Sequence, residues 1–502
     1  MSEYNYEEMG FKSGLEIHQQ LDSHKLFCKC PSILRQDEPH YEFTRRLHAV
    51  AGESGEVDVA AGYASGAIIG IDQKVVGGRI IEINIQSSLK KEFVYQAYDT
   101  TCLVEMDEEP PREINKEALM IVLHIALLLN ATILPISQIM RKTVINGSNT
   151  SGFQRTCMIA RDGYVDTHYG KVRIDGIFLE EDSARLIKNE KDKVYYRLDR
   201  LGIPLVEIST YPDIKSPEQA KEVALFIGDV LRSCKVKRGI GTIRQDVNMS
   251  IQNGARTELK GVQDPDIIVH AMNKEIERQQ ILIKEGKKVE SGVRNVADDG
   301  SSEFLRPMPG SDRMYPETDL PLLKISREFI DEAKKTLPKL KGVIEESLKK
   351  DGLAEEYIKI LFKQDKVNLY RELYYLLPKP NFIAKMILLY PKEIASKSNK
   401  TLEDVESLLE ENYIDVLNLL IKGKVKEDHI RDIFEKIVFG VSLQESIKFE
   451  EVDSNEVEER IMKIIKEKPG LNENAYMGLV MKEFKGKITG SQAMDIIKRL
   501  MK

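Results

Sequence analysis

The chain has 502 residues, of which 42% are hydrophobic and 31% charged, so it can bury a sizeable core and we expect about two to four domains. Its formal net charge of -7 argues against a protein that coats nucleic acid non-specifically, because neutralising phosphates requires many Lys and Arg residues. A transmembrane helix is also excluded, since the longest strongly apolar stretch, residues 118–129, is too short and contains His124.

The N-terminal residues and the cysteines both indicate a cytoplasmic protein. Residues 2–8 are acidic and polar and lack the basic start and apolar core of a secretory signal. Five cysteines are too few and too scattered for a disulfide framework. Only Cys28 and Cys30 are close in sequence. Because no second Cys or His pair accompanies them, we interpret them as two small buried residues rather than as half of a zinc site.

Two kinds of sequence divide the chain. Up to about Lys324, β-branched residues and Asn-Gly or Asp-Gly turns prevail, and two helices are predicted, over 116–130 and over 216–233. After Pro321, apolar residues recur at helical spacing to the C-terminus. We therefore predict an α+β fold with a mixed α/β domain built on an antiparallel sheet (1–325), a helical bundle domain (326–452) and a small helical tail (453–502).

The predicted tail differs from the rest of the chain in charge. An acidic stretch, 450–459, precedes it. From Ile461 onward nine Lys or Arg residues stand against four Asp or Glu residues, a surplus of five positive charges. Such a local basic patch is suited to phosphate contacts although the chain as a whole is negative.

The first candidate site is the segment Gly14–His18. Apolar and polar residues alternate there, so on a strand Glu16 and His18 share one face while Leu15 and Ile17 enter the core. The two polar side chains are competent to bind a metal, but an exposed surface strand would show the same pattern.

Two further segments carry carboxylates. Glu180, Glu181 and Asp182 are adjacent, which is usually explained by a solvated face and less often by a neighbouring divalent cation. Glu207 stands alone in the apolar segment 203–209. Because burying an unpaired carboxylate is very costly, Glu207 needs a cation, a metal or hydrogen-bond donors.

Residues 242–262 predict a β-hairpin around Asn253-Gly254. A two-residue loop would set polar residues opposite apolar ones, so we prefer a three-residue loop with Gly254 in the left-handed conformation, which pairs Ile251 with Ala255. One face of this hairpin then carries both acids and bases, namely Arg244, Asp246, Asn248, Ser250, Arg256, Glu258 and Lys260. A cross-strand ladder of ion pairs and a floor for an anionic, metal-bound substrate both fit that face.

Two segments are rich in turn-forming residues and donors. Residues 146–156 could cradle phosphate through backbone N–H groups and Arg155, or form an ordinary surface loop. The stiff segment 306–321 is either a linker or the wall of a site.

Together these segments resemble the GatB/GatE family of tRNA-dependent amidotransferases, and within it the archaeal-type GatE proteins that act on glutamyl-tRNA(Gln). The matching stretches are GLEIHQQLDSHKLFCKCPS, INGSNTSGFQRT, LEEDSAR, YYRLDRLGIPLVEISTYPDIKSPEQA, KRGIGTIRQDVNMSI, ELKGVQ and RMYPETDLP. The resemblance covers nearly the whole chain, including residues 475–487, which are similar to the family's tRNA-binding tail.

The resemblance implies an enzyme with a cradle-shaped first domain. Such an enzyme uses ATP and Mg²⁺ to phosphorylate the γ-carboxylate of glutamate carried on tRNA(Gln), and ammonia from an asparaginase-like partner subunit then replaces the phosphate. It also implies a cytoplasmic heterotetramer with that partner and no membrane association.

The resemblance further implies roles for individual residues. His18, Glu181 and Glu207 match the primary metal ligands, and Glu16, Asp246 and Glu258 match a second metal-binding or ammonia-guiding set. To these catalytic residues we add Arg155, Arg244 and Lys260 as anion contacts for the nucleotide.

Two departures from the family pattern keep alternatives open. GatE proteins carry an inserted domain, similar to one in bacterial aspartyl-tRNA synthetases, about where residues 283–302 form a short linker here. Bacterial GatB proteins have a downstream Cys pair that this chain lacks. The motifs favour the GatE type, with the GatB type of a three-subunit enzyme as the alternative. Interpretations of another class are a non-catalytic tRNA-binding protein of the same fold and a metal-dependent hydrolase.

Overall fold

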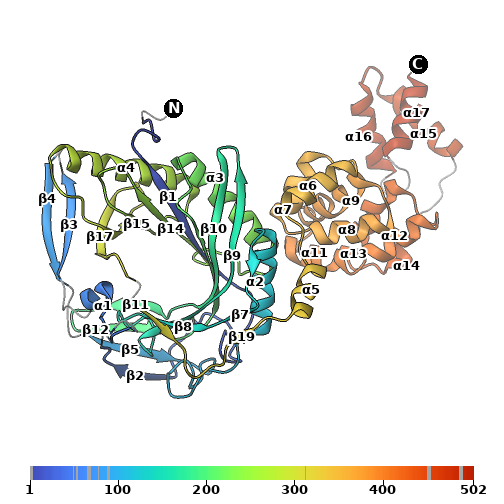
Figure 1. Ribbon diagram of the computed structural model, residues 1–502. Coiled ribbons are helices and arrows are strands. Elements are labelled where there is room, and N and C mark those ends of the chain that lie inside the picture. Colours follow the sequence, from blue (N-terminus) through green and yellow to red (C-terminus); the bar gives the residue numbers. More distant parts are fainter. Residues whose placement is uncertain are drawn as a thin grey trace. The chain divides into compact units, whose positions relative to one another are not determined.

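The computed structural model describes residues 4–48, 50–52, 55–64, 69–76, 79–86, 91–310, 313–448, 454–484 and 490–501. The chain divides into two units, Met1–Lys341 and Gly342–Lys502, which are described separately (Figure 1). The first unit contains all the described strands and the second consists of helices, which confirms the α+β class. Across the described ranges, no helix has the length and apolar character needed to span a membrane.

A large mixed sheet forms the body of the first unit. Its strands follow the order β17 (Ser302–Pro307), β16 (Gly292–Val296), β15 (Thr257–Lys260), β14 (Ile243–Ser250), β1 (Lys12–Gln20), β13 (Pro204–Thr210), β10 (Gly170–Glu181), β9 (Phe153–Thr167), β8 (Ile139–Thr143) and β18 (Met314–Pro316), with β6 (Thr132–Ile133) on β9. Neighbouring strands are antiparallel except β15 and β16. The segment Gly14–His18 therefore lies on a central strand and not on an exposed one.

Smaller elements complete the first unit. A second sheet has the order β11 (Arg185–Asn189), β12 (Lys193–Arg197), β5 (Glu92–Ala97) and β2 (Tyr41–Arg45). Two strand pairs stand apart from it: β3 (Ile69–Val76) with β4 (Arg79–Gln86), and β7 (Ile136–Ser137) with β19 (Leu323–Lys324). The helices are α1 (Val59–Ala64), α2 (Lys116–Leu128), α3 (Pro217–Ser233), α4 (Pro265–Lys284) and α5 (Arg327–Lys335).

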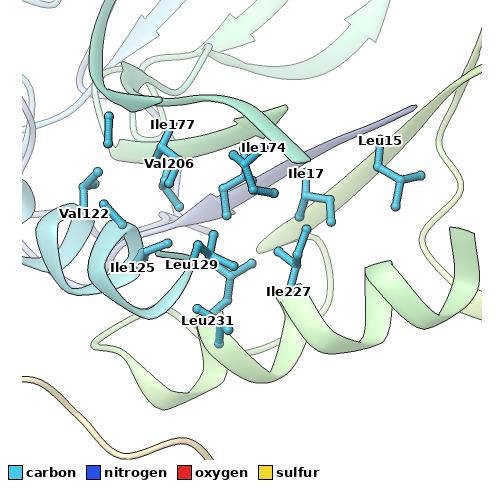
Figure 2. Close-up of a cluster of buried hydrophobic side chains, with 14 of the residues drawn as sticks. Leu15, Ile17, Val122, Ile125, Leu129, Ile174, Ile177, Val206, Ile227 and Leu231 are labelled. Atoms are coloured by element: carbon cyan, nitrogen blue, oxygen red, sulfur yellow. The ribbon is translucent and has the colours of Figure 1, made fainter. Parts of the chain in front are cut away.

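The hydrophobic core of the first unit lies between the large sheet and its helices. Leu15 and Ile17 of β1 are at most 1% exposed and belong to one core with Ile227 and Leu231 of α3 and Val122 of α2 (Figure 2). Each such fully buried aliphatic side chain contributes about 1.5–3 kcal/mol. Because side chains alternate along a strand, this packing directs Glu16 and His18 to the opposite face of the sheet.

Both helices predicted in the first unit are present. Helix α3 begins as expected, with Pro217 in its first turn and the Ser216 hydroxyl accepting the Gln219 N–H at 3.1 Å. Helix α4 was missed, although the same signal precedes it: the Asp264 carboxylate accepts the Asp266 N–H at 2.9 Å and Pro265 follows. Polar residues interrupt the helical periodicity of apolar residues in α4. The helix was therefore not predicted among the turn-forming residues that surround it.

The predicted hairpin has the preferred register. Val247, Asn248 and Met249 lie opposite Leu259, Glu258 and Thr257. The left-handed residue is Asn253, with φ 61°, and not Gly254 as predicted. Asn tolerates this conformation, and Gly254 serves a different purpose, since a Cβ there would lie 2.1 Å from the Gln279 side-chain oxygen.

The second unit consists of short helices. These are α6 (Lys341–Lys350), α7 (Glu355–Lys363), α8 (Val367–Leu376), α9 (Pro380–Leu388), α10 (Tyr390–Ala395), α11 (Leu402–Glu410), α12 (Tyr413–Ile421), η2 (Glu427–His429), α13 (Ile430–Val438), α14 (Leu443–Ser446), α15 (Ser454–Glu467), α16 (Glu473–Glu483) and α17 (Gly490–Leu500). Helices α15 to α17 share a small core of their own that includes Ile461, Tyr476 and Ile497. The unit starts at residue 342 rather than 326 because α5 packs against α2 of the first unit.

Candidate functional site

A cavity of about 550 Å³ lies on the face of the large sheet that carries Glu16 and His18. Its floor is formed by side chains from β8, β10, β1, β13, β14 and β15, and its wall by residues between β17 and β18. The charged residues and the histidine that line it are Glu16, His18, Lys142, Glu180, Asp182, Glu207, Arg244, Asp246, Arg256, Glu258, Lys260, Arg306 and Arg313. The hairpin face that was predicted to carry both acids and bases therefore lines the cavity, and its side chains also form ion pairs.

One group of ligand atoms converges from three neighbouring strands. A ring nitrogen of His18 and carboxylate oxygens of Glu180 and Glu207 all lie within 4.8 Å of one another. His18 and Glu207 are directly opposite in the β1–β13 pairing, and their side chains approach to 3.1 Å. An imidazole with two carboxylates is a donor set that a divalent cation accepts.

Lys142 of β8 neutralises this group, a role that no sequence pattern suggested. Its ammonium lies 3.1 Å from a Glu180 oxygen and 3.3 Å from a Glu207 oxygen. Burial alone would raise the pKa of Glu207, but Lys142 and His18 hold that pKa well below its usual range. Burial and the charge of Glu207 together raise the pKa of Glu180. Glu207 thus has the compensating partners that its position in an apolar strand required.

A second carboxylate group lies next to the first. Oxygens of Glu16, Asp246 and Glu258 lie within 4.8 Å of one another. The Lys260 ammonium is 2.5 Å from Asp246 and 2.7 Å from Glu258. Burial, and then Glu207 and Glu258, raise the pKa of Glu16. The three residues grouped by the resemblance therefore lie together on the floor of the cavity.

Glu181 does not join either group; its neighbour Glu180 lies beside His18 and Glu207 instead, so the structure does not bring His18, Glu181 and Glu207 together. Glu181 projects to the other face of β10, where an oxygen accepts the Arg155 backbone N–H at 3.1 Å. Arg155 is 6% exposed and lies 2.7 Å from the buried Glu317. Arg155 does not line this cavity, so its contact with an anionic ligand stays a prediction.

The adjacent acids and the other predicted anion contacts are already paired. Glu180 and Asp182 are each 1% exposed, so the solvated face expected for these acids is not present. Arg244 lies 2.8 Å from an Asp182 oxygen, and Lys260 has the partners given above. Both cations line the cavity and each is paired with a carboxylate of its floor, and their contact with an anionic ligand stays a prediction.

Both turn-rich segments belong to the cavity. Asn146, Ser148 and Gln154 of the first segment line it, so this segment is not an ordinary surface loop. The described residues of the stiff segment form a wall and not merely a linker, through Arg306, Met308, Pro309, Gly310, Arg313 and Met314.

A separate cluster shows that Cys28 and Cys30 are not alone. The sulfur atoms of Cys28, Cys30 and Cys102 and an oxygen of Glu105 lie within 4.8 Å of one another. Glu105 is also 2.7 Å from the ammonium of the fully buried Lys25. Three thiols and a carboxylate form a donor set that zinc accepts. The sequence did contain a signal for this cluster, because Cys102 stands three residues before Glu105. A search restricted to a second Cys or His pair does not detect it.

Comparisons with known proteins match the part of the chain that carries this cavity. A family model described as the GatB/GatE catalytic domain matches residues 11–331. The chain is 34% identical to a protein of Methanocaldococcus jannaschii named as the E-type subunit of glutamyl-tRNA(Gln) amidotransferase, over 100% of both chains. A protein of the same name from Methanosarcina acetivorans is 51% identical over 56% of this chain and 42% of its own. The Methanocaldococcus alignment spans 653 residues, so that relative contains residues with no counterpart here, in agreement with the missing inserted domain.

Proposed function

The chain belongs to the GatB/GatE family, and we propose on this basis that it is the subunit of a tRNA-dependent amidotransferase that activates glutamate carried on tRNA(Gln). The relatives covering the whole chain are named as the E-type subunit, which favours this function over that of a bacterial GatB protein. The observation that carries the proposal is the convergence of His18, Glu180 and Glu207 on one side of a cavity.

The residues of the cavity suit activation of a carboxylate. A carboxylate is a poor acyl donor, and phosphorylation by ATP gives it a leaving group that ammonia can displace. His18, Glu180 and Glu207 would hold Mg²⁺, which when bound supplies charge neutralisation for the phosphates. Lys142 provides a further cation beside the same carboxylates. The second carboxylate group, around Glu16, is placed to bind or orient the incoming ammonia.

The predicted tail supplies a surface for the tRNA. Helices α15 to α17 bury their apolar side chains in a core of their own. Their described lysines, Lys463, Lys466, Lys468, Lys482 and Lys498, are exposed, whereas Lys485, Lys487 and Lys502 lie outside the described residues. Exposed cations on a small folded helical unit can contact phosphates without disturbing its core.

The names of the relatives support a partner subunit. Because the relatives that cover the whole chain are named as one subunit of an amidotransferase, we propose an asparaginase-like subunit as the source of ammonia, in a cytoplasmic heterotetramer. A non-catalytic tRNA-binding protein would not need to retain an imidazole and two carboxylates as a ligand group. A metal-dependent hydrolase would have no use for the basic tail.

Two neighbouring carboxylates give a matched test of the cation site. Glu180→Gln is expected to weaken Mn²⁺ binding to the full chain by at least about 10-fold, because it removes a charged ligand. Glu181→Gln should leave Mn²⁺ binding unchanged and lower the thermal stability instead, because Arg155 loses one of its anionic partners. Calorimetric titration with Mn²⁺ as the Mg²⁺ substitute measures the first effect. An equal loss of Mn²⁺ binding in both variants would contradict the assignment of Glu180.

A further inference from the structure

Two arginines on the wall of the cavity differ from the cations on its floor. Lys142, Arg244 and Lys260 of the floor each lie between 2.5 and 3.1 Å from a carboxylate oxygen. Within the described part of the chain, Arg306 and Arg313 line the same cavity with no hydrogen bond or ion pair to an acidic side chain. Among the described residues, the floor cations Lys142, Arg244 and Lys260 are thus paired with carboxylates, whereas Arg306 and Arg313 of the wall are not. Arg256, which also lines the cavity, donates to the Asn248 side-chain oxygen at 3.0 Å.

The topology explains how these arginines come to face the floor. Arg306 lies in β17, and Arg313 directly precedes β18. These strands stand at opposite ends of the strand order of the large sheet, yet only six residues separate Pro307 from Met314, so the sheet must curve and the passage from β17 to β18 bridges its two ends. Met308, Pro309 and Gly310, which line the cavity, lie on this passage. The two guanidinium groups are thus part of a wall opposite the carboxylates.

A buried carboxylate anchors this wall. Asp58 is 3% exposed, and one of its oxygens accepts the Gly310 N–H at 2.6 Å. Its other oxygen accepts the Ala60 and Ala61 N–H groups at 3.0 and 3.1 Å, at the start of α1. Asp58 therefore ties the wall at Gly310 to the start of α1.

Burial and mutual repulsion act against the charges of the wall, and Glu258, Asp58 and Asp246 offset this effect on the pKa of Arg306 only in part. Burial and then the charge of Arg313 lower the pKa of Arg306, so the two groups are close enough to repel each other. Arg remains protonated in proteins, so proton loss cannot relieve this repulsion. An anion between the two guanidinium groups would relieve it, and their planar donor sets match phosphate oxygens.

We propose that Arg306 and Arg313 bind the polyphosphate of the nucleotide, between the wall and the cation held by His18, Glu180 and Glu207. This inference rests on the proposed function, because it takes ATP as the substrate of the cavity. A polyphosphate carries several charged oxygens and can contact both sides of the cavity at once. A γ-carboxylate, with a single charge, cannot neutralise two guanidinium groups and a bound divalent cation together.

The test compares nucleotide binding by single variants. Arg306→Met and Arg313→Met, each in the full chain with its partner subunit, should weaken binding of a non-hydrolysable ATP analogue with Mg²⁺ by about 10-fold or more. Binding of AMP, which lacks the β- and γ-phosphates, should change little. Arg173→Met is the matched control, because Arg173 is exposed and paired with Asp213 at 2.8 Å outside the cavity.

The outcomes separate this inference from the function on which it rests. Failure of the unaltered protein to bind the ATP analogue would remove the proposed function. Normal binding by the unaltered protein and by both Met variants would overturn the role of the arginines alone. Loss of tRNA binding with intact nucleotide binding would also overturn it, since the wall would then serve the tRNA backbone. Should a Met variant fail to fold, the Lys variant at the same position retains the charge and should show a smaller loss of analogue binding.

Discussion

Replacing Glu207 with Gln is expected to abolish formation of Gln-tRNA(Gln) by the complex of this chain with its ammonia-producing partner. The substitution keeps the shape of the side chain and removes the charge that faces His18 at 3.1 Å and Lys142 at 3.3 Å. Loss of this charge should reduce turnover by at least about 100-fold, as removal of a single electrostatic contact to a transition state does. Conversion of labelled glutamyl-tRNA measures the loss.

The same variant should bind tRNA almost as well as the unaltered protein, because Glu207 lies in the floor of the cavity and not in the basic tail. Glu222→Gln is the matched control: Glu222 lies on α3 and faces the exposed His168. It should convert glutamyl-tRNA at the normal rate. Normal turnover by Glu207→Gln would remove Glu207 from the chemistry.

Deleting residues 453–502 is expected to weaken tRNA binding and to flatten its dependence on salt. The deletion removes ten Lys and Arg residues, nine of them from Ile461 onward, together with eight Asp and Glu residues. For every phosphate that the shortened chain no longer neutralises, the slope of log affinity against log salt should become shallower by about 1. Filter binding of tRNA(Gln) over a series of salt concentrations measures both effects.

A milder change controls for damage to the fold. Lys463→Gln with Lys482→Gln retains the helices and their core but removes two exposed charges, and it should move affinity and slope in the same direction as the deletion. Lys171→Gln with Lys188→Gln removes two exposed charges from the first unit and should change the slope less. Unchanged affinity across salt after the deletion would exclude the tail from tRNA binding.

Local sequence was sufficient to predict much of the architecture. The cap at Ser216 acts within one helical turn, so the start of α3 could be predicted from it. The alternation of polar and apolar residues around Glu16 likewise predicted which face of β1 is buried. The hairpin register followed from matching apolar with apolar positions across the turn. Which residue of the loop is left-handed did not follow, because packing of Gly254 against Gln279 is a long-range contact.

The sequence does not show which of two adjacent residues on a strand faces the cavity. Glu180 and Glu181 are adjacent, so only the phase of the strand decides which of them faces the cavity. The register of β10 is irregular after Ile174 and after Ile177, which prevents counting along the strand from sequence. The same uncertainty about which strand residue faces the cavity applies to Gln154, which lines the cavity, and to Arg155, which does not.

Contacts between distant segments were the other limit. Lys142 reaches Glu180 and Glu207 from a strand that no motif singled out. Cys102 joins Cys28 and Cys30 across more than 70 residues of chain. Such contacts between distant residues depend on the order of strands in the sheet, which the local pattern of residues does not specify.

The central claim is that this cavity uses ATP to activate glutamate while it is attached to tRNA. The most direct measurement is phosphate release from ATP by the chain with its partner subunit, with and without glutamyl-tRNA(Gln). We predict that the charged tRNA stimulates phosphate release and that each phosphate released accompanies one Gln-tRNA formed when ammonia is supplied. Formation of Gln-tRNA at full rate without ATP would contradict the account.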